Sequence, residues 1–174
     1  MNEKKRRWLI VALIIVVIGI GGKMYMDKRA KDMAELHEIQ TDLANYLYNN
    51  YKIYTSDQKK VDEIDKAYEA ANKEWTNLEY LEKLKTARVY SDINKIEFTG
   101  FYVGPMKGLV VEFVINDVYP DETTLDTISY ETGKWIYSFD SGNTRNNYVL
   151  DEKEKSTNFS LPENSVIYYE GGIK

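Results

Sequence analysis

Few residues in this sequence could carry out chemistry. The single histidine, His37, stands in a predicted helix far along the chain from any candidate serine nucleophile, and the sequence contains no cysteine. It also lacks the G-x-S-x-G motif of a serine hydrolase and the glycine-rich loop that holds nucleotide phosphates. We therefore predict no catalytic residue, no cofactor-binding residue and no cofactor.

Carboxylates are the remaining candidates for acid–base or metal chemistry. Asp140, Thr144, Asn146 and Asp151 lack the regular acidic spacing of a calcium loop. Asp117, Asp121 and Glu122 cluster in one predicted loop and could hold calcium weakly, although a solvated loop is the preferred interpretation. One histidine and no cysteine exclude the usual zinc ligand sets. A glycosidase would need two carboxylates beside a sugar cleft, and no pair stands out among so many acidic residues. The sequence thus predicts no metal site and favours a protein that is not an enzyme. The alternative is an envelope ligand-binding sensor or a carboxylate-dependent envelope enzyme.

Tyrosine is the residue type that stands out, with 15 tyrosines against five phenylalanines. A tyrosine buries apolar area while keeping a polar tip, so it suits both half-buried sheet surfaces and protein interfaces. Both roles fit this chain. The candidate binding surface consists of four tyrosines from its second half: Tyr130, Tyr137, Tyr148 and Tyr168.

A membrane anchor is predicted near the N-terminus. Residues 8–22 carry no charge and follow four consecutive basic residues. A helix over residues 8–26 has about 19 residues and a length of ~28 Å, which is enough to cross the hydrocarbon core. Trp8 and Tyr25 would lie at opposite membrane interfaces, and the long stem of Lys23 would reach the headgroups.

A cleaved signal peptide is the alternative to this anchor, although the small-residue cleavage pattern is poor. In either case the bulk of the chain is exported. The basic N-terminal tail predicts a cytoplasmic N-terminus and a single-pass protein of the cell membrane, with its C-terminal domain outside the cytoplasm. Residues 27–174 hold 18 basic and 27 acidic residues, a net charge of −9. This charge argues against nucleic acid as a partner.

Helices are predicted first along the exported chain. Apolar residues recur at helical spacing from residue 27 until residues 49–54 end the pattern. A capping box beginning at Thr55 introduces a second helix, Asp57–Trp75, and another beginning at Thr76 introduces a short helix, Asn77–Lys85. We expect the first two helices to form an antiparallel pair.

Strands follow, with the boundary between helical and β halves at about residue 90. Ile93–Val103 is predicted as a strand with a bulge at Gly100, because the inward-facing parity flips there. A turn in which Gly108 takes a positive φ leads to the strand Leu109–Asn116. After a loop over residues 117–122, we expect a hairpin of residues 123–130 and 134–139, a loop over 140–147, a charged segment over 151–163 and a last strand over 166–169.

Helices before strands make the predicted fold α+β. We expect an N-terminal transmembrane helix, a helical hairpin or stalk, and a four- to five-stranded antiparallel meander packed on the helices. The sheet face expected under the helical pair carries Leu109, Val111, Phe113, Ile115 and Trp135. The predicted organisation is a cytoplasmic tail (1–7), a transmembrane segment (8–26), an extracytoplasmic helical region (27–90) and a β region (91–174).

One segment of the β region matches a known pattern. The sequence F-T-G-F-Y-V-G-P-M-K-G-L-V-V-E-F-V-I-N at residues 98–116 resembles small membrane-anchored proteins of unknown function from Firmicutes. Pro105, Met106, Gly108 and the Ile115–Asn116 strand end match their strand, P-M-G-G turn and strand, whereas Lys107 replaces the usual glycine. The resemblance covers the anchor and about twenty-five β residues, and it implies location and domain type without catalytic residues. Some such proteins are immunity or secretion-accessory partners of exported toxins.

The leading functional hypothesis is a membrane-anchored, extracytoplasmic protein-binding module. It rests on an anchored, acidic and tyrosine-rich domain without a catalytic set, and an immunity or secretion-accessory role is its sharpest form. Its partners would be the lipid bilayer, through the N-terminal helix, and a protein outside the membrane. A purely structural stalk is a further alternative.

Overall fold

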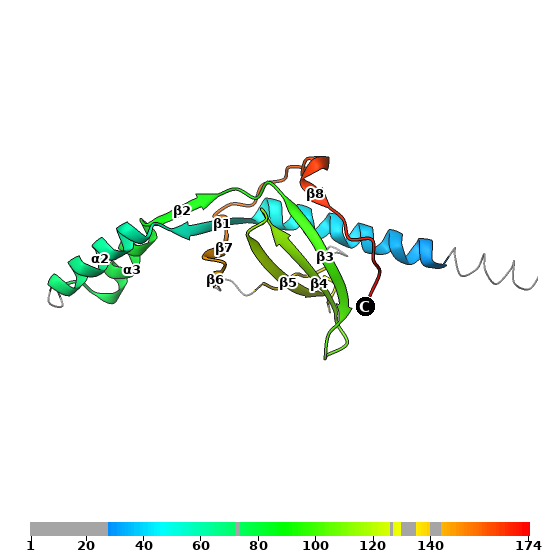
Figure 1. Ribbon diagram of the computed structural model, residues 1–174, viewed down its shortest axis with the longest axis horizontal. Coiled ribbons are helices and arrows are strands. Elements are labelled where there is room, and N and C mark those ends of the chain that lie inside the picture. The colour runs from blue at the N-terminus through cyan, green and yellow to red at the C-terminus, as the bar shows by residue number, and fades with distance from the viewer. Residues whose placement is uncertain (1–27, 72–73, 126, 130–134, 140–143) are drawn as a thin grey trace, which may run out of the picture. The chain divides into compact units, whose positions relative to one another are not determined.

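The computed structural model describes residues 28–71, 74–125, 127–129, 135–139 and 144–174 (Figure 1). The chain divides into two compact units, Met1–Ile39 and Gln40–Lys174. Residues 28–39 of the first unit are helical, and the second unit begins with helical residues 40–50 and contains every strand. The α+β class and the helix predicted up to residue 50 are confirmed from residue 28 onward. The predicted tail (1–7) and transmembrane segment (8–26) lie outside the described residues.

One four-stranded antiparallel sheet contains strands from distant parts of the sequence. Its order is β2-β1-β7-β6, and β1 pairs with β2 on one side and with β7 on the other. Residues 51–54, predicted to end the first helix, instead form the start of β1. Both partners of β1 are distant along the chain, so no local sequence pattern predicted the pairing. The strands are β1 (Tyr51–Ser56), β2 (Arg88–Ser91), β6 (Thr144–Arg145) and β7 (Tyr148–Glu152).

The second sheet has the order β5-β4-β3-β8, and Figure 1 shows its three long strands side by side. The predicted bulge is confirmed, because the β3–β4 register shifts between Phe98 and Gly100. Strand β8 runs parallel to β3. The predicted single antiparallel meander is therefore wrong: the strands form two sheets, one of which is mixed. The strands are β3 (Ile96–Val103), β4 (Leu109–Ile115), β5 (Tyr119–Leu125) and β8 (Val166–Ile167).

Two tight turns explain differences from the prediction. Asn116 (φ 50°) and Asp117 (φ 62°) both have positive φ, and the Val118 N–H donates to the Ile115 carbonyl, as in a type I′ hairpin turn. This turn starts β5 within the segment that was predicted to be a loop. In the β3–β4 turn, the residue with positive φ is Lys107 (64°) and not Gly108, so that prediction was wrong. The usual glycine in the resembling proteins stands at this same position.

Inward-facing side chains of the two sheets and of helical residues 40–50 form the core of the second unit. As predicted, Val111, Phe113 and Ile115 are buried. Leu43 and Leu47 are fully buried, whereas α2 and α3 contribute no buried residue. The expectation that a helical pair covers this sheet face is therefore wrong, because the helical side chains in the core of this unit come from residues 40–50. The largest fully buried side chains in this unit are Leu43, Leu47, Ile53, Ile93, Ile96, Phe101, Phe113, Ile115, Tyr119 and Leu150.

The helices α2 (Gln58–Ala70) and α3 (Asn77–Lys85) lie between β1 and β2 in the chain, so the predicted division into helical and β halves at residue 90 is wrong. The N-cap of α2 is Asp57, because Thr55 belongs to β1, and α2 ends before the predicted Trp75. Helix α3 has the predicted bounds and capping box. Its partner in an antiparallel pair is α2, through contacts that are local in sequence.

The predicted hairpin of residues 123–139 is present only in part. Residues 123–125 belong to β5. Beyond it, Ile128 and Trp135 form an isolated antiparallel bridge, and the Ile136 N–H donates to the Thr127 carbonyl at 3.0 Å. The turn predicted at residues 131–133 lies outside the described residues.

Candidate binding surfaces

The most distinctive surface is the α2–α3 hairpin, which we define as residues 57–87. Asp57 caps α2 by accepting hydrogen bonds from the backbone N–H groups of Lys59 and Lys60. Thr76 caps α3 by accepting from the Glu79 backbone N–H, and its own N–H and hydroxyl both donate to the Glu79 carboxylate, which holds the Glu79 pKa below its usual range. These caps satisfy backbone donors that the helix ends would otherwise leave unpaired.

Aromatic side chains hold the two helices of the hairpin together. The rings of Tyr68 and Tyr80 lie 4.4 Å apart between centroids, and Trp75 lies 6.2 Å from Tyr68. The Tyr80 hydroxyl donates to Asp65 Oδ1 at 2.7 Å, and this hydrogen bond raises the Tyr80 pKa. The contacts that build the hairpin are therefore internal to it.

The hairpin leaves the β-sheet and returns to it at a single point. The β1–β2 ladder closes with the pair Ser56–Arg88, and the Asp57 N–H donates to the Ala87 carbonyl at 2.8 Å just beyond it. Residues 57–87 thus form an excursion between two directly opposed strand residues (Figure 1). The strand pairing continues up to the point at which the helices start.

Exposed apolar residues gather on the hairpin and on the adjoining strand. Leu78 is 68% exposed and Leu81 54%, while Val89 and Tyr90 of β2 are 50% and 43% exposed. A groove of about 560 Å³ lies where the hairpin meets the strands. Its apolar lining comes from Tyr54, Val61, Leu78, Leu81 and Leu84, and its polar lining comes from Ser56, Gln58, Glu82, Lys85 and Arg88. Apolar area that the fold does not use is typical of an interaction surface.

A layer of aromatic and charged side chains covers one face of the β2-β1-β7 sheet. The Arg88 guanidinium lies 4.4 Å from the Tyr54 ring centre, and Lys52 Nζ lies 3.8 Å from that of Tyr90. The Tyr90 hydroxyl donates to Asp151 Oδ2 at 2.9 Å, and Arg88 lies 3.5 Å from the same oxygen. These contacts order the exposed face of β2.

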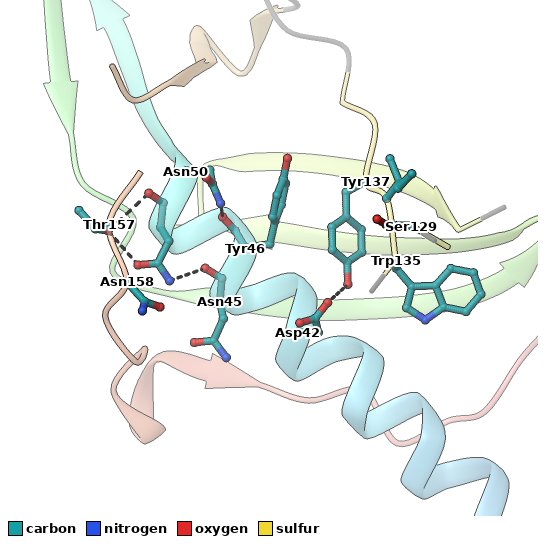
Figure 2. A pocket seen from close by; sticks show the side chains of 11 residues that line it. Asp42, Asn45, Tyr46, Asn50, Ser129, Trp135, Tyr137, Thr157 and Asn158 are labelled. Atoms are coloured by element: carbon teal, nitrogen blue, oxygen red, sulfur yellow. Dashed lines mark hydrogen bonds between the residues drawn. The ribbon is translucent and has the colours of Figure 1, made fainter. Parts of the chain in front are cut away.

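A second groove, of about 420 Å³, lies on helical residues 40–50 (Figure 2). Side chains one helical turn apart form one part of its lining, and residues 129, 135–137 and 157–158 form the rest. Four of the side chains that line it are amides: Asn45, Asn49, Asn50 and Asn158. Such a lining could hydrogen-bond a neutral ligand.

Most of these amides already have structural partners. Asn49 donates to the carbonyls of Asn45 and Phe159, and its Oδ1 accepts from Thr157 Oγ1 at 2.8 Å and from the Phe159 N–H at 2.9 Å. Asn45 Oδ1 accepts from the Leu161 N–H. The two asparagines therefore clamp residues 157–161 to the helix. We call this arrangement the Asn49 clamp.

Tyr137 closes the other side of this groove. It is 7% exposed, and its hydroxyl donates to Asp42 Oδ2 at 2.8 Å, as Figure 2 shows. Burial is the main cause that raises the Tyr137 pKa, and the bonded carboxylate adds to it. The side chains of Asn158 and Trp135 show no hydrogen bond within the described part of the chain, so they are the groove's available polar groups.

The four tyrosines predicted as a binding surface do not share one environment. Tyr137 is buried, Tyr148 is half-buried in β7, and the Tyr168 hydroxyl lies 3.2 Å from Thr41 Oγ1. Tyr130 lies outside the described residues, as do Trp8, Lys23 and Tyr25 of the predicted anchor. The residues that sequence reasoning missed are Leu78, Leu81, Val89 and Tyr90. A stripe of leucines in α3 without an apolar partner was the available signal.

The acidic cluster considered for calcium is dispersed. Asp117 accepts from Lys95, Asp121 lies 3.6 Å from Arg145, and Glu122 accepts from the Tyr102 hydroxyl. Among the described residues, no group of three or more His, Cys, Asp or Glu could hold a metal ion. No helix in the described ranges is both long and apolar enough to cross a membrane.

Comparison with known proteins adds no relative. No protein-family model, no curated protein and no solved structure matches this chain.

Proposed function

We propose that this protein is a single-pass, membrane-anchored extracytoplasmic module that binds another protein through its α2–α3 hairpin. The observation that carries the proposal is that the helices of this inserted hairpin contribute no side chain to the core. Helices α2 and α3 have no buried residue, and α3 exposes Leu78 and Leu81, which gives the hairpin an apolar surface suited to a partner. The proposal assigns no catalytic residue, and an immunity or secretion-accessory role is its sharpest version.

Site-specific photo-crosslinking tests the binding surface. A photoreactive amino acid replaces Leu81 in the full chain in its native membrane, and a matched variant carries it at Met106, which is 94% exposed in the β3–β4 turn. We expect a discrete protein adduct from position 81 that Leu78→Asp abolishes, and no such adduct from position 106. Equal adducts from both positions, or none from position 81, would contradict the proposal.

Protease accessibility tests the location. The basic tail before the apolar run favours a cytoplasmic N-terminus and an exported domain. Protease added to cells stripped of their wall but with intact membranes should digest the domain as it does in lysates. Protection in those cells, with digestion only after lysis, would overturn the exported topology.

A ligand-binding sensor is the second candidate function, and the groove of Figure 2 favours it. Asn158 and Trp135 would provide its polar contacts, beside the rings of Tyr46 and Tyr137. If this candidate holds, Trp135→Ala abolishes ligand binding while leaving the crosslink at position 81 unchanged.

A further inference from the structure

The four edges of the two described sheets differ in how they are protected. An edge strand presents unpaired N–H and C=O groups, and proteins usually shorten, cover or interrupt it. Strand β5 contains Pro120, which has no N–H, and its flank contacts β6 through the Asp121–Arg145 ion pair. Strand β6 has two residues. Beside β3, the two-residue β8 and the Phe101–Ile173 bridge occupy the edge.

Strand β2 is the exception among the described strands. It has four residues, contains no proline and pairs with β1 on one side. Val89 and Tyr90 at its centre are half exposed. At its first residue, Arg88, the strand reaches the apolar groove of the hairpin. The line of backbone donors and acceptors along β2 therefore begins at Arg88, a residue that also lines this groove.

We propose that β2 is the docking edge for an extended segment of the partner protein, which adds a strand to the β2-β1-β7-β6 sheet and places an apolar side chain in the groove beside Leu78 and Leu81. This inference rests on the proposed function and names its binding mode. Only a polypeptide offers N–H and C=O groups at the spacing of a strand edge, so the edge itself specifies the class of ligand. Such strand addition draws affinity from the backbone and specificity from side-chain pockets.

The groove favours a partner segment over a second copy of this chain. If β2 of a second copy paired here, the residues that follow its Ser91 would be held in their own fold. Ile93 is 1% exposed, and Asn116 Oδ1 accepts from the N–H groups of Asn94 and Lys95. On the other side, Ala87 is 1% exposed and bonded to Asp57. Neither end of the copy's strand could continue into the groove, whereas a free segment could.

The test uses the full chain in lipid nanodiscs and a phage-displayed library of linear twelve-residue peptides as the probe. We expect the selected peptides to alternate apolar and polar residues, which is the pattern of a half-buried strand. Binding of one synthetic selected peptide should slow amide hydrogen exchange in residues 88–91 at least tenfold. Peptides that bind without slowing exchange in β2 would overturn the inference.

Two proline variants provide a matched pair. Neighbouring residues of a strand direct their N–H groups to opposite edges, so of Val89→Pro and Tyr90→Pro one removes a donor to β1 and the other a donor from the free edge. The variant that keeps the wild-type melting temperature should bind the peptide at least tenfold more weakly. Leu81→Glu should weaken binding at least fivefold, and Met106→Glu should leave it unchanged. Unchanged peptide affinity in the stable proline variant contradicts strand addition.

The outcomes separate this inference from the proposed function. If the crosslink at position 81 persists in the stable proline variant, the hairpin binds a partner without strand addition, and this inference alone fails. If the protein forms a dimer whose β2 amides are already protected without peptide, the occupant is a second copy, which also overturns it. Loss of both the crosslink and the peptide signal in every hairpin variant supports both proposals.

Discussion

The body of the second unit and the hairpin inserted into it are built in opposite ways. The body consists of the two sheets with helical residues 40–50, and its inward side chains from Leu43 to Leu150 are nearly all fully buried. The hairpin is held by two caps, aromatic contacts and one Tyr–Asp hydrogen bond, and its helices α2 and α3 bury no residue. The body therefore accounts for the stability of the fold, and the hairpin is available for an interaction.

Introducing a carboxylate into each region should give the largest difference in unfolding free energy between the body and the hairpin. Phe113→Asp puts a carboxylate at a position that is 1% exposed, which should cost about 3–5 kcal/mol of unfolding free energy. Leu81→Asp replaces a side chain that is 54% exposed and should change stability by less than about 0.5 kcal/mol. Urea unfolding followed by circular dichroism measures both. Similar losses would mean that the hairpin belongs to the core.

The Asn49 clamp tests whether the body also depends on polar contacts. Asn49→Ala removes two donated and two accepted hydrogen bonds and leaves the Phe159 N–H without its partner, so we expect a loss of about 1–3 kcal/mol. Asn158→Ala is the control, because that side chain is exposed and has no hydrogen bond within the described residues. Equal melting temperatures for the two variants would show that the Asn49 clamp does not stabilise the body.

Alkaline pH should destabilise the body more than the hairpin, because the buried tyrosines lie in the body. Burial raises the pKa values of Tyr51, Tyr119 and Tyr137 above their usual range. In the unfolded chain a tyrosine ionises near pH 10, whereas the buried hydroxyl keeps its proton. Stability should therefore be constant below about pH 10 and fall above it, by up to about 1.4 kcal/mol per pH unit for each tyrosine.

Tyrosine-to-phenylalanine variants show whether the pH dependence of stability comes from the body or from the hairpin. Tyr137→Phe should reduce the slope of stability against pH above pH 10, as measured by urea titrations at several pH values. Tyr80→Phe, in the exposed hairpin, should reduce it less. A larger effect from Tyr80 would reverse the proposed order of the two regions.

The smallest predicted effect concerns the β3–β4 turn of the body. Lys107 has a φ of 64°, a left-handed conformation that costs energy for a residue with a Cβ atom. Lys107→Gly should relieve this cost and raise the unfolding free energy by up to about 1 kcal/mol, because the gain exceeds the added freedom of the unfolded chain. Met106→Gly, at a neighbouring turn residue without a positive φ, should not stabilise the protein. A destabilised Lys107→Gly variant would contradict the assigned turn geometry.

The sequence predicted those parts of the fold that local chemistry specifies. The capping box of Thr76 and Glu79 gave the start of α3, the alternation from Leu109 to Ile115 gave β4, and the change of parity at Thr99–Gly100 gave the bulge. Strand β1 was missed because its ladder joins Tyr54 to Tyr90 and to Val149, residues that no short window contains. The first part of β5, residues 119–122, was missed because Pro120 and the acidic residues beside it suggested a loop.

The candidate surface was harder to predict than the fold. Tyrosine content pointed to Tyr137, whose hydroxyl is bonded to Asp42 inside the body. The exposed leucines of α3 looked like ordinary packing residues, because a helical stripe does not show whether another element covers it. Their exposure follows from the position of α2 and α3 between two paired strands, where neither helix has a buried residue. Exposure depends on tertiary structure, so a sequence pattern alone did not reveal it.

The most direct test of the account replaces residues 57–87 with Asn-Gly. Ser56 and Arg88 are directly opposed in an antiparallel pair, so a two-residue type I′ turn can join them. The measurement is the free energy of unfolding in urea. We expect a cooperative transition within about 1 kcal/mol of the intact chain, because α2 and α3 bury no residue and the shorter connection loses less entropy on closure. A variant that is unfolded, or that loses more than about 3 kcal/mol, would show that the hairpin is part of the body and contradict the account.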